Sequence, residues 1–529
     1  MGNTIQPDGS DSSLVATRER RWLLVLSSLL LVLGSIQASA HGLFHYPGNV
    51  PQFLIGIAIM GLGYSLSWRL LDAPLSAAWF WAIAVATRLI FLPMYPGSDI
   101  WRYLWEGAIQ LQGFSPYEQA PSAPELLPYR TGWWPLINNA DVSAIYPPVT
   151  QFGFRLLAAL TQPMQGDGTV SLLAFKLAFM AADVGICWLL WRRFGTRAML
   201  YGWNPLVIYS FAGGGHYDSW LILPLVAAWL WSEEAPHPPI LGEPDLEPKA
   251  GKGLRQWTAL WWPSHDSPAS GTPLVTGGRG HPYVQGSCKT FLGIDSIGLK
   301  GRLVQAVLIG ISIGVKWITL PALAFLSWRA LVGNTAGRWE RATTPMMIRF
   351  AIAALVFLVG LLPMALSALV YCDSMSCSLV PTSSTFVVSA RTAEFLPHFI
   401  GMLWPASLES NRLLALPLGA VTLVLLVWCR SLGQFALSYL IALLMLSPIV
   451  HAWYFTWMIP FAVRRDGPGC SVGNWGPIWG SLSVFVYFVW TGQQVGDFGW
   501  FAEWGERPLI WGPLVLGCLW TGYRHRVAL

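Results

Sequence analysis

The segment from Asp99 to Glu106 combines acidic, basic and phenolic side chains at helical spacing. Asp99, Arg102, Tyr103 and Glu106 stand at positions i, i+3, i+4 and i+7, which places side chains on one face of a helix. Pro96-Gly97-Ser98 ends the preceding apolar run, and its serine can cap a helix that begins at Asp99. A carboxylate on that face can accept a proton from a sugar hydroxyl. The alternative is an amphipathic surface helix with solvated charges, and these residues alone do not separate the two.

Two further polar sites interrupt the apolar chain. Lys316, in Gly314-Val315-Lys316-Trp317, is a single cation between two apolar segments, and a phosphate is a suitable partner for it. The alternative is a lysine that snorkels to the interface. His216 and Asp218 follow the glycine run 213–215, and glycine lets the backbone approach a ligand closely. The alternative there is a tight turn that carries polar residues.

An aromatic run, His451-Ala452-Trp453-Tyr454-Phe455-Thr456-Trp457, comes later in the chain. Its histidine indicates a catalytic or binding role, and an aromatic belt at the membrane interface is a strong alternative. Lys176 and Asp183 lie seven residues apart in one apolar segment. We expect both to contact other helices in a structural role, because buried charges are usually paired.

The composition is that of a polytopic membrane protein. Of 529 residues, 54% are hydrophobic and 11% are charged, against about 25% charged in an average soluble domain. The 31 tryptophans suit the two interfaces of a bilayer. Because a chain in lipid must satisfy its backbone internally, we expect an all-α fold. The basic residues are scattered, which argues against nucleic acid as a partner.

Basic residues recur at alternate ends of the apolar runs, beginning with Arg18, Arg20 and Arg21 before the first run. Since lysine and arginine favour the cytoplasmic side, this pattern puts the loop 371–411 outside. Cys372 and Cys377 lie in that loop, in a compartment that is oxidising in many cells, so we hypothesise a disulfide. The pattern predicts about fourteen spans in four parts: a cytoplasmic tail 1–21, a transmembrane part 22–231 with an outer loop 94–150, a cytoplasmic Pro/Gly-rich insertion 232–302, and a transmembrane part 303–529.

Two segments leave the span assignment open at the sequence level. The apolar stretch from Leu303 to Trp328 has Arg302 before it and Arg329 after it, and one span cannot have two cytoplasmic ends. We therefore predict two short spans joined outside near Lys316. The first apolar run ends at Ala38-Ser39-Ala40, which also fits a signal-peptidase site.

Taken together, these motifs resemble the GT-C superfamily of membrane glycosyltransferases. The likeness is greatest to the branch that uses polyprenyl-phosphate-mannose, and it spans most of residues 75–465. Each motif is degenerate, but their order and their common outer side are fairly specific. The motifs are Ser98-Asp99-Ile100-Trp101-Arg102-Tyr103, Trp105-Glu106-Gly107, Gly113-Phe114-Ser115-Pro116-Tyr117, Ile145-Tyr146-Pro147-Pro148, Trp203-Asn204-Pro205-Leu206, Gly215-His216-Tyr217-Asp218, Lys316 and His451-Ala452-Trp453-Tyr454.

The resemblance implies roles for these residues. Asp99 matches the family's catalytic base, with Glu106 as a second catalytic candidate. Cations such as Lys316 and Arg102 are expected to stabilise the released phosphate. Some relatives carry two acids separated by one residue and use a metal, whereas Asp99 is followed by Ile100 and Trp101, so a divalent metal is not supported and no cofactor is certain. The remaining expected donor-phosphate or substrate contacts are Tyr103, Tyr146, His216, Asp218, His451 and Tyr454.

The expected activity is transfer of a hexose, with mannose favoured, from a polyprenyl-phosphate sugar to an acceptor hydroxyl, with inversion at the glycosyl carbon. The acceptor is a glycan, glycolipid or lipid, and membrane lipids surround the protein. We expect a multi-pass protein of the bacterial plasma membrane whose active site faces outward. The alternative is a transporter or flippase of lipid-linked sugars. Such a protein typically has internal repeats with broken helices at mid-membrane, and the sequence has no evident repeat.

Overall fold

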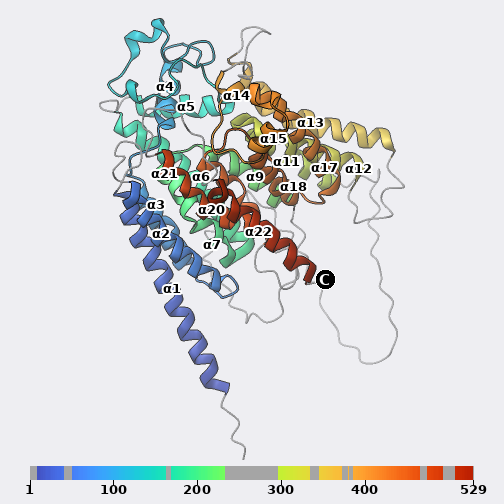
Figure 1. Cartoon of the computed structure of the whole chain (residues 1–529). Coiled ribbons are helices and arrows are strands. Elements are labelled where there is room, and N and C mark those ends of the chain that lie inside the picture. Colours follow the sequence, from blue (N-terminus) through green and yellow to red (C-terminus); the bar gives the residue numbers. More distant parts are fainter. Residues whose placement is uncertain are drawn as a thin grey trace, which may run out of the picture. The chain divides into compact units, whose positions relative to one another are not determined.

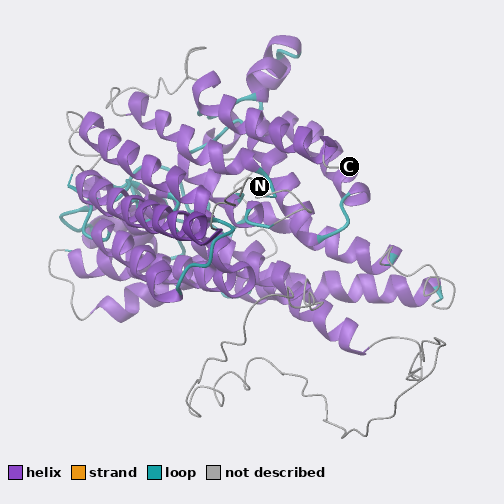
Figure 2. Cartoon of the chain, turned by 90° about the horizontal axis from the view of Figure 1, so that it is seen from below, coloured by secondary structure: helices purple, strands orange, loops and turns teal. Residues whose placement is uncertain are grey.

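The computed structural model describes residues 9–40, 50–162, 168–232, 296–333, 345–371, 379, 385–464, 473–491 and 507–527. Throughout these ranges the regular elements are helices, and the one β contact is an isolated parallel bridge between Thr392 and Ile449 (Figures 1 and 2). The expected all-α class is confirmed. Contacts divide the chain into one unit of 1–232 with 295–529 and another of Glu233–Ile294. The second unit lies outside the described residues, as do Cys372 and Cys377.

Six helical stretches in the described chain are long and apolar enough to cross a membrane: Arg18–Ser39, Val50–Leu70, Thr169–Gly202, Gly298–Val315, Met346–Ala368 and Asn411–Trp428. Five apolar helices are shorter: Ala77–Phe91, Asp218–Trp231, Trp317–Val332, Leu432–Leu446 and Trp475–Val489. The structure thus supports six candidate spans and does not confirm about fourteen.

The predicted run 198–211 shows why the span count differs. It forms η6 (Gly195–Ala198), α7 (Met199–Gly202), α8 (Pro205–Ile208) and a π-helix, η7 (Tyr209–Gly213), in place of one continuous helix. The break falls at Asn204, because Pro205 has no amide proton with which to continue the preceding helix. The side-chain oxygen of Asn204 then caps the next helix by accepting hydrogen bonds from the amides of Leu206 and Val207.

The chain begins with two antiparallel helices, α1 (Gly9–Ser39) and α2 (Val50–Ser67), which lie side by side in Figure 1. Ser27 donates to the carbonyl of Gly63 at 2.6 Å. A Cβ on Gly34 would lie 2.6 Å from the backbone nitrogen of Met60, so small residues permit this close approach. After η2 (Trp68–Leu70), α3 (Ala77–Phe91) packs on α1, where Trp79 donates to Ser28 at 2.9 Å.

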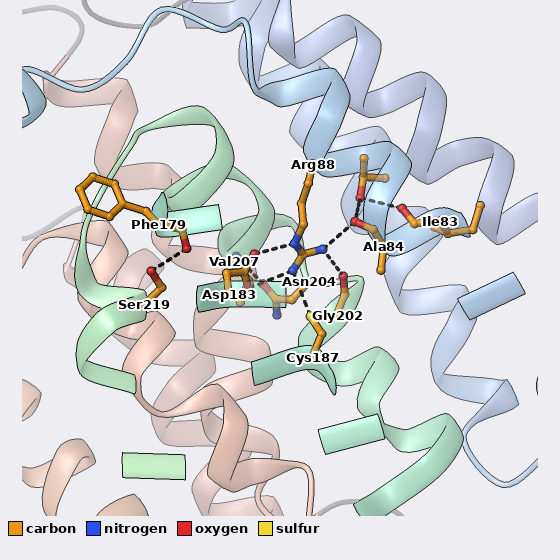
Figure 3. A network of polar contacts seen from close by, with 11 residues as sticks. Ile83, Ala84, Arg88, Phe179, Asp183, Cys187, Gly202, Asn204, Val207 and Ser219 are labelled. Atoms are coloured by element: carbon orange, nitrogen blue, oxygen red, sulfur yellow. Dashed lines mark hydrogen bonds and ion pairs between the residues drawn. The ribbon is translucent and has the colours of Figure 1, made fainter. Parts of the chain in front are cut away.

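A buried ion pair joins α3 to α6 (Thr169–Phe194) (Figure 3). The Arg88 guanidinium contacts both carboxylate oxygens of Asp183, at 2.5 and 3.1 Å, and also donates to the carbonyls of Ala84 and Gly202. Two turns before Asp183 on α6, the Lys176 ammonium donates to the carbonyl of Met94 at 2.7 Å. The predicted structural role of Lys176 and Asp183, with partners outside their own helix, is confirmed.

The middle of the chain packs as α9 (Asp218–Ser232), α11 (Ser296–Val315), α12 (Leu320–Val332) and α13 (Met346–Ala368). The predicted break between two short helices is present, since Lys316 is extended (φ −155°, ψ 125°) and precedes η8 (Trp317–Thr319). Helix α11 begins at Ser296, so the last residues of the predicted insertion 232–302 are helical.

The described residues after α13 form short elements and three longer helices. After α13 come α14 (Thr385–Ser389), α15 (Leu396–Leu403), α16 (Ala406–Glu409) and η10 (Asn411–Leu414). Then follow α17 (Ala415–Trp428), α18 (Leu432–Leu446), η11 (Ala452–Trp457), α19 (Ile459–Ala462), α20 (Trp475–Ser483), η12 (Val484–Val486), α21 (Tyr487–Thr491) and α22 (Arg507–Val527).

The loop 94–150 contains α4 (Asp99–Leu111), η3 (Pro124–Tyr129) and η4 (Trp134–Leu136), and leads into α5 (Pro148–Thr161). Helix α4 begins at Asp99 as predicted, but Ser98 makes no capping bond and instead accepts from Asn138 at 3.3 Å. The alternative of a solvated surface helix is wrong, because Arg102 and Glu106 are 3% and 1% exposed.

Candidate functional site

One pocket collects side chains from five separate segments of the chain. Its walls come from α4, the loop 138–147, the start of α9, the break after α11 and the residues 451–454. The cavity measures about 130 Å³, several times the roughly 10–15 Å³ that one buried water needs. Eight of the predicted site residues line it: Asp99, Arg102, Tyr103, Tyr146, Asp218, Lys316, His451 and Tyr454.

Asp99 stands at the first position of α4 with its carboxylate held on two sides. Its Oδ1 accepts a hydrogen bond from Asn138 at 2.6 Å, and its Oδ2 lies 3.7 Å from Nδ1 of His216. The side chain keeps 24% of its surface exposed. Burial raises the pKa of Asp99 above its usual range, although the Asn138 hydrogen bond acts against this rise. A carboxylate with a raised pKa is a stronger proton acceptor than an ordinary aspartate.

Backbone contacts fix the loop of His216 against the start of α4. The amide of Gly97 donates to the carbonyl of Gly214 at 2.9 Å. Gly215 has a φ of +72°, and a Cβ there would lie 2.6 Å from the Ile100 side chain. Only glycine meets both demands readily. The glycine run therefore serves to bring its loop onto α4, and the histidine next to it reaches Asp99.

Lys316 is an ion-pair partner of Asp218 and is surrounded by aromatic rings. Its Nζ lies 2.8 Å from Oδ1 of Asp218, 4.3 Å from the ring centre of Tyr454 and 4.7 Å from that of Trp457. Trp457 also donates to the same Oδ1 at 2.8 Å. The other oxygen of Asp218 is buried and has no hydrogen-bond partner among the described residues. Lys316 thus brings a cation to the pocket wall, and Asp218 holds that cation in place.

Arg102 and Glu106 form a buried pair one turn along α4, 2.7 Å apart. Arg102 also donates to the carbonyls of Asn139 and Val142, and Glu106 accepts from Gln151 at 2.6 Å. Three of the five guanidinium N–H groups are engaged in these bonds, so two remain. Glu106 does not line the pocket. The structure therefore places this second predicted catalytic acid behind Arg102, where it neutralises and orients the guanidinium.

Two histidines stack on the indole of Trp453. The His216 ring lies 3.7 Å from the centre of Trp453 at 15°, and the His451 ring lies 4.5 Å away at 5°. Burial lowers the pKa of each histidine to about 3, so both are neutral at pH 7. His451 shares a hydrogen bond with the Tyr487 hydroxyl at 2.9 Å and lines the pocket. His216, 1% exposed, lies behind Asp99 and is not part of the pocket wall.

Three tyrosines pack edge to face at the base of the site. The ring of Tyr103 lies 5.3 Å from the rings of Tyr146 and Tyr217. Burial raises the pKa of all three phenols, so they stay protonated and can donate hydrogen bonds at neutral pH. Pockets with aromatic walls and a few fixed polar groups are typical of ligand sites.

Several residues of the site were not predicted from the sequence. Asn138, Tyr217 and Trp453 line the pocket, and Trp457 holds Asp218. Tyr217, Trp453 and Trp457 belong to motifs noted in the sequence, and Asn138 lies in the predicted outer loop 94–150. No residue type in these segments distinguishes a residue of the pocket wall from one that only packs. Among the described residues no group of three or more histidine, cysteine or acidic side chains is arranged to hold a metal ion.

Comparisons with models of protein families, with curated proteins and with solved structures find no match for this chain. The pocket itself is therefore the observation from which a function follows.

Proposed function

We propose that this chain is a membrane glycosyltransferase that moves a hexose from a polyprenyl phosphate to an acceptor hydroxyl. The observation that carries the proposal is the pocket in which Asp99, with its raised pKa, and the cation of Lys316 lie among aromatic walls. A base and a cation in one pocket suit a reaction in which a hydroxyl loses a proton while a phosphate gains charge. Mannose is the first sugar to test, in keeping with the family resemblance.

In the proposed reaction Asp99 accepts the proton of the acceptor hydroxyl. The hydroxyl oxygen forms a bond to the anomeric carbon from the face opposite the phosphate. The bond from that carbon to the phosphate oxygen breaks, and its electron pair leaves with the polyprenyl phosphate. The configuration is inverted, no covalent intermediate forms, and no general acid is required because the phosphate is a good leaving group.

Lys316 and Arg102 are proposed to bind the donor phosphate. Lys316 has three N–H donors, of which one is directed to Asp218. Arg102 has two N–H groups beyond those bonded to Glu106 and the loop carbonyls. Charge-assisted hydrogen bonds to phosphate are among the stronger ones. The pairing of each cation with a carboxylate keeps the empty site from carrying a large net charge.

We propose a multi-pass protein of the bacterial plasma membrane with this pocket facing outward. The described chain has six long apolar helices and five shorter ones, so the proposed count of about fourteen crossings requires that broken segments such as 198–213 also traverse the bilayer. Basic helix ends lie near one another: Arg302 interacts with Arg329, and Arg464 donates to Ser431, next to Arg430, at 3.5 Å. That grouping supports a common cytoplasmic side for these ends.

The test is incubation of the purified protein in lipid nanodiscs with radiolabelled polyprenyl-phosphate mannose, glucose or galactose and an extract of glycan and lipid acceptors. Transfer of label to a new product supports the enzyme. Movement of an intact lipid-linked sugar across a proteoliposome membrane, without any new product, contradicts the glycosyltransferase proposal and supports the transporter. Nanodiscs and proteoliposomes without the protein serve as the background in the two assays.

A further inference from the structure

A second and larger cavity lies against α4 on the side opposite Asp99. It measures about 540 Å³, within the roughly 300–1,000 Å³ of small-molecule sites. Trp101, Leu104 and Ala108 line it, whereas Asp99, Arg102 and Tyr103 line the first pocket. At 3.6 residues per turn these two sets occupy opposite faces of one helix. Helix α4 is therefore a partition between a polar pocket and this second cavity.

The walls of the second cavity are apolar and aromatic. Trp133 and Leu136 close it from the loop side, and Phe175 closes it from α6. The rings of Trp101 and Trp133 lie 6.0 Å apart at 32°. Among the described residues the polar side-chain groups of the wall are two hydroxyls and the indole N–H groups of Trp101 and Trp133. The hydroxyl of Ser171 already donates to Thr161 at 3.0 Å. A sugar buried here would leave hydroxyls without partners, which is costly, so a hydrocarbon is the better occupant.

The position of the cavity indicates where such a hydrocarbon comes from. Ser171 and Phe175 belong to the first two turns of a candidate membrane span, Thr169–Gly202, so the cavity is level with the end of that span. Ala158 of α5 lines the cavity, and on the opposite face of the same helix Leu156 and Leu160 are 60% and 64% exposed. In the membrane placement proposed above, exposed leucines at this level face lipid.

We infer that the second cavity is a binding site for the hydrocarbon chain of a membrane lipid, which enters from the bilayer beside α5 and packs against Trp101 and Trp133. The inference rests on the membrane placement given above, and it does not require the transfer reaction. Two lipids share this chemistry: a bilayer phospholipid, and the isoprenoid or acyl chain of a lipid substrate.

Photocrosslinking tests the site. The full-length protein is reconstituted in nanodiscs that contain a phospholipid with a diazirine in its acyl chain, irradiated, digested and analysed by mass spectrometry. We expect adducts on peptides that carry Trp101 to Ala108 and Thr131 to Leu136. Ala108→Phe, which fills the cavity, should reduce these adducts about tenfold, while Leu156→Phe on the exposed face of α5 should leave them unchanged. Leu136→Gln, which adds polarity without filling space, should also reduce them and covers the case in which Ala108→Phe fails to fold.

Equal labelling of the wild type and of both cavity variants would overturn the site. Leu358 and Leu366 of α13, which are 62% and 61% exposed, report the labelling of a lipid-facing surface. Cavity labelling no higher than theirs would also overturn the site. The source of the chain follows from the transfer assay. A raised KM for donor or acceptor in Ala108→Phe identifies a substrate lipid, and an unchanged KM identifies a bilayer lipid. If wild type transfers no sugar but the adducts persist, the proposed function fails and the lipid site stands.

Discussion

At the scale of single residues, the site contains two carboxylates with different surroundings. One carboxylate oxygen of Asp218 accepts hydrogen bonds from both Lys316 and Trp457, so the negative charge of Asp218 is paired with the Lys316 ammonium. Asp99 receives a single hydrogen bond, from the neutral Asn138, and burial raises its pKa. A carboxylate without a cation in direct contact, and with a raised pKa, is the better proton acceptor. In the proposed reaction the role of base therefore falls to Asp99.

The substitution Asp99→Asn keeps the shape of the side chain and removes its ability to accept a proton. A positioned base contributes about 10²–10⁴-fold in rate, so turnover should fall by that factor while expression and donor binding are retained. Glu106→Gln should be milder in turnover, because Glu106 acts through Arg102. The measurement is steady-state transfer by purified variants, with Asp141→Asn, an exposed aspartate of the same loop, as the control. Full turnover in Asp99→Asn would show that another group is the base.

Asn138→Ala changes the pH dependence of the same step. Asp99 must be ionised to accept a proton, so activity is lost as pH falls through its pKa. Because that pKa is raised, the acid limb of kcat/KM lies above the value of about 3.9 typical of aspartate. The Asn138 hydrogen bond lowers the pKa, so its removal should move the acid limb to still higher pH and leave the rate at alkaline pH nearly unchanged. An acid limb that stays in place, or moves down, contradicts the assignment.

Lys316→Ala should weaken the donor more than the acceptor. The lysine lines the pocket and supplies N–H donors to it, and a charged hydrogen bond is worth roughly 1.5–3 kcal/mol. We expect the KM for the lipid donor to rise about tenfold or more, with a smaller change for the acceptor. Asp218→Asn, which keeps the lysine but loosens it, should have an intermediate effect. If donor dependence is the same in all three proteins, Lys316 only packs among the aromatic rings.

At the scale of secondary-structure elements, the site depends on helices that are held by buried polar contacts. Arg88 on α3 and Asp183 on α6 fix these helices to each other and to the carbonyl of Gly202 (Figure 3). Lys176 on α6 then binds the carbonyl of Met94, five residues before Asp99. This series of contacts connects the interior of the helical bundle to the start of α4. The position of Asp99 is therefore set in part by side chains that lie outside the pocket.

Removing one member of the Arg88–Asp183 pair should destabilise the fold. Both side chains are at most 1% exposed, and breaking a buried pair costs about 3–5 kcal/mol because the remaining charge is left unpaired. Arg88→Met and Asp183→Leu should each lower the thermal unfolding temperature in detergent, and the double variant should be less destabilised than the sum of the two. The matched control is Asp72→Asn in the Arg197 pair, whose aspartate is 65% exposed and should matter by less than about 1 kcal/mol. Strict additivity of Arg88→Met and Asp183→Leu would contradict direct coupling.

At the scale of the whole molecule, charge and hydropathy predict which loops meet but not how each side chain is covered. The helix start at Asp99 and the break at Lys316 follow from local residue types, and both are present. Helical periodicity put Glu106 on the same face as Asp99, but its burial depends on Gln151 of α5, a neighbour that no local pattern identifies. The position of His216 behind Asp99 likewise depends on tertiary neighbours that no local pattern identifies. Segment 198–213 has the composition of a membrane span, yet its helix is interrupted before Pro205 and ends as a π-helix. This broken conformation depends on packing from all sides.

The final prediction concerns the orientation of the chain in the membrane. If the pocket opens outward, the loop that carries α4 and the segment that carries α16 are outside, and the ends of α2 and α17 are inside. Single cysteines are introduced on a background without native cysteines at exposed positions: Glu118 and Glu409 for the outer side, Asp72 and Arg430 for the inner side. In intact cells a membrane-impermeant maleimide should label Glu118→Cys and Glu409→Cys, and should label the other two only after permeabilisation. The reverse pattern would put the pocket in the cytoplasm, where sugar donors include nucleotide sugars as well as lipids, and would rule out a reaction on the outer face. A mixed pattern would overturn the assignment of the basic helix ends to one common side, because Asp72 is paired with Arg197 of η6, directly after α6.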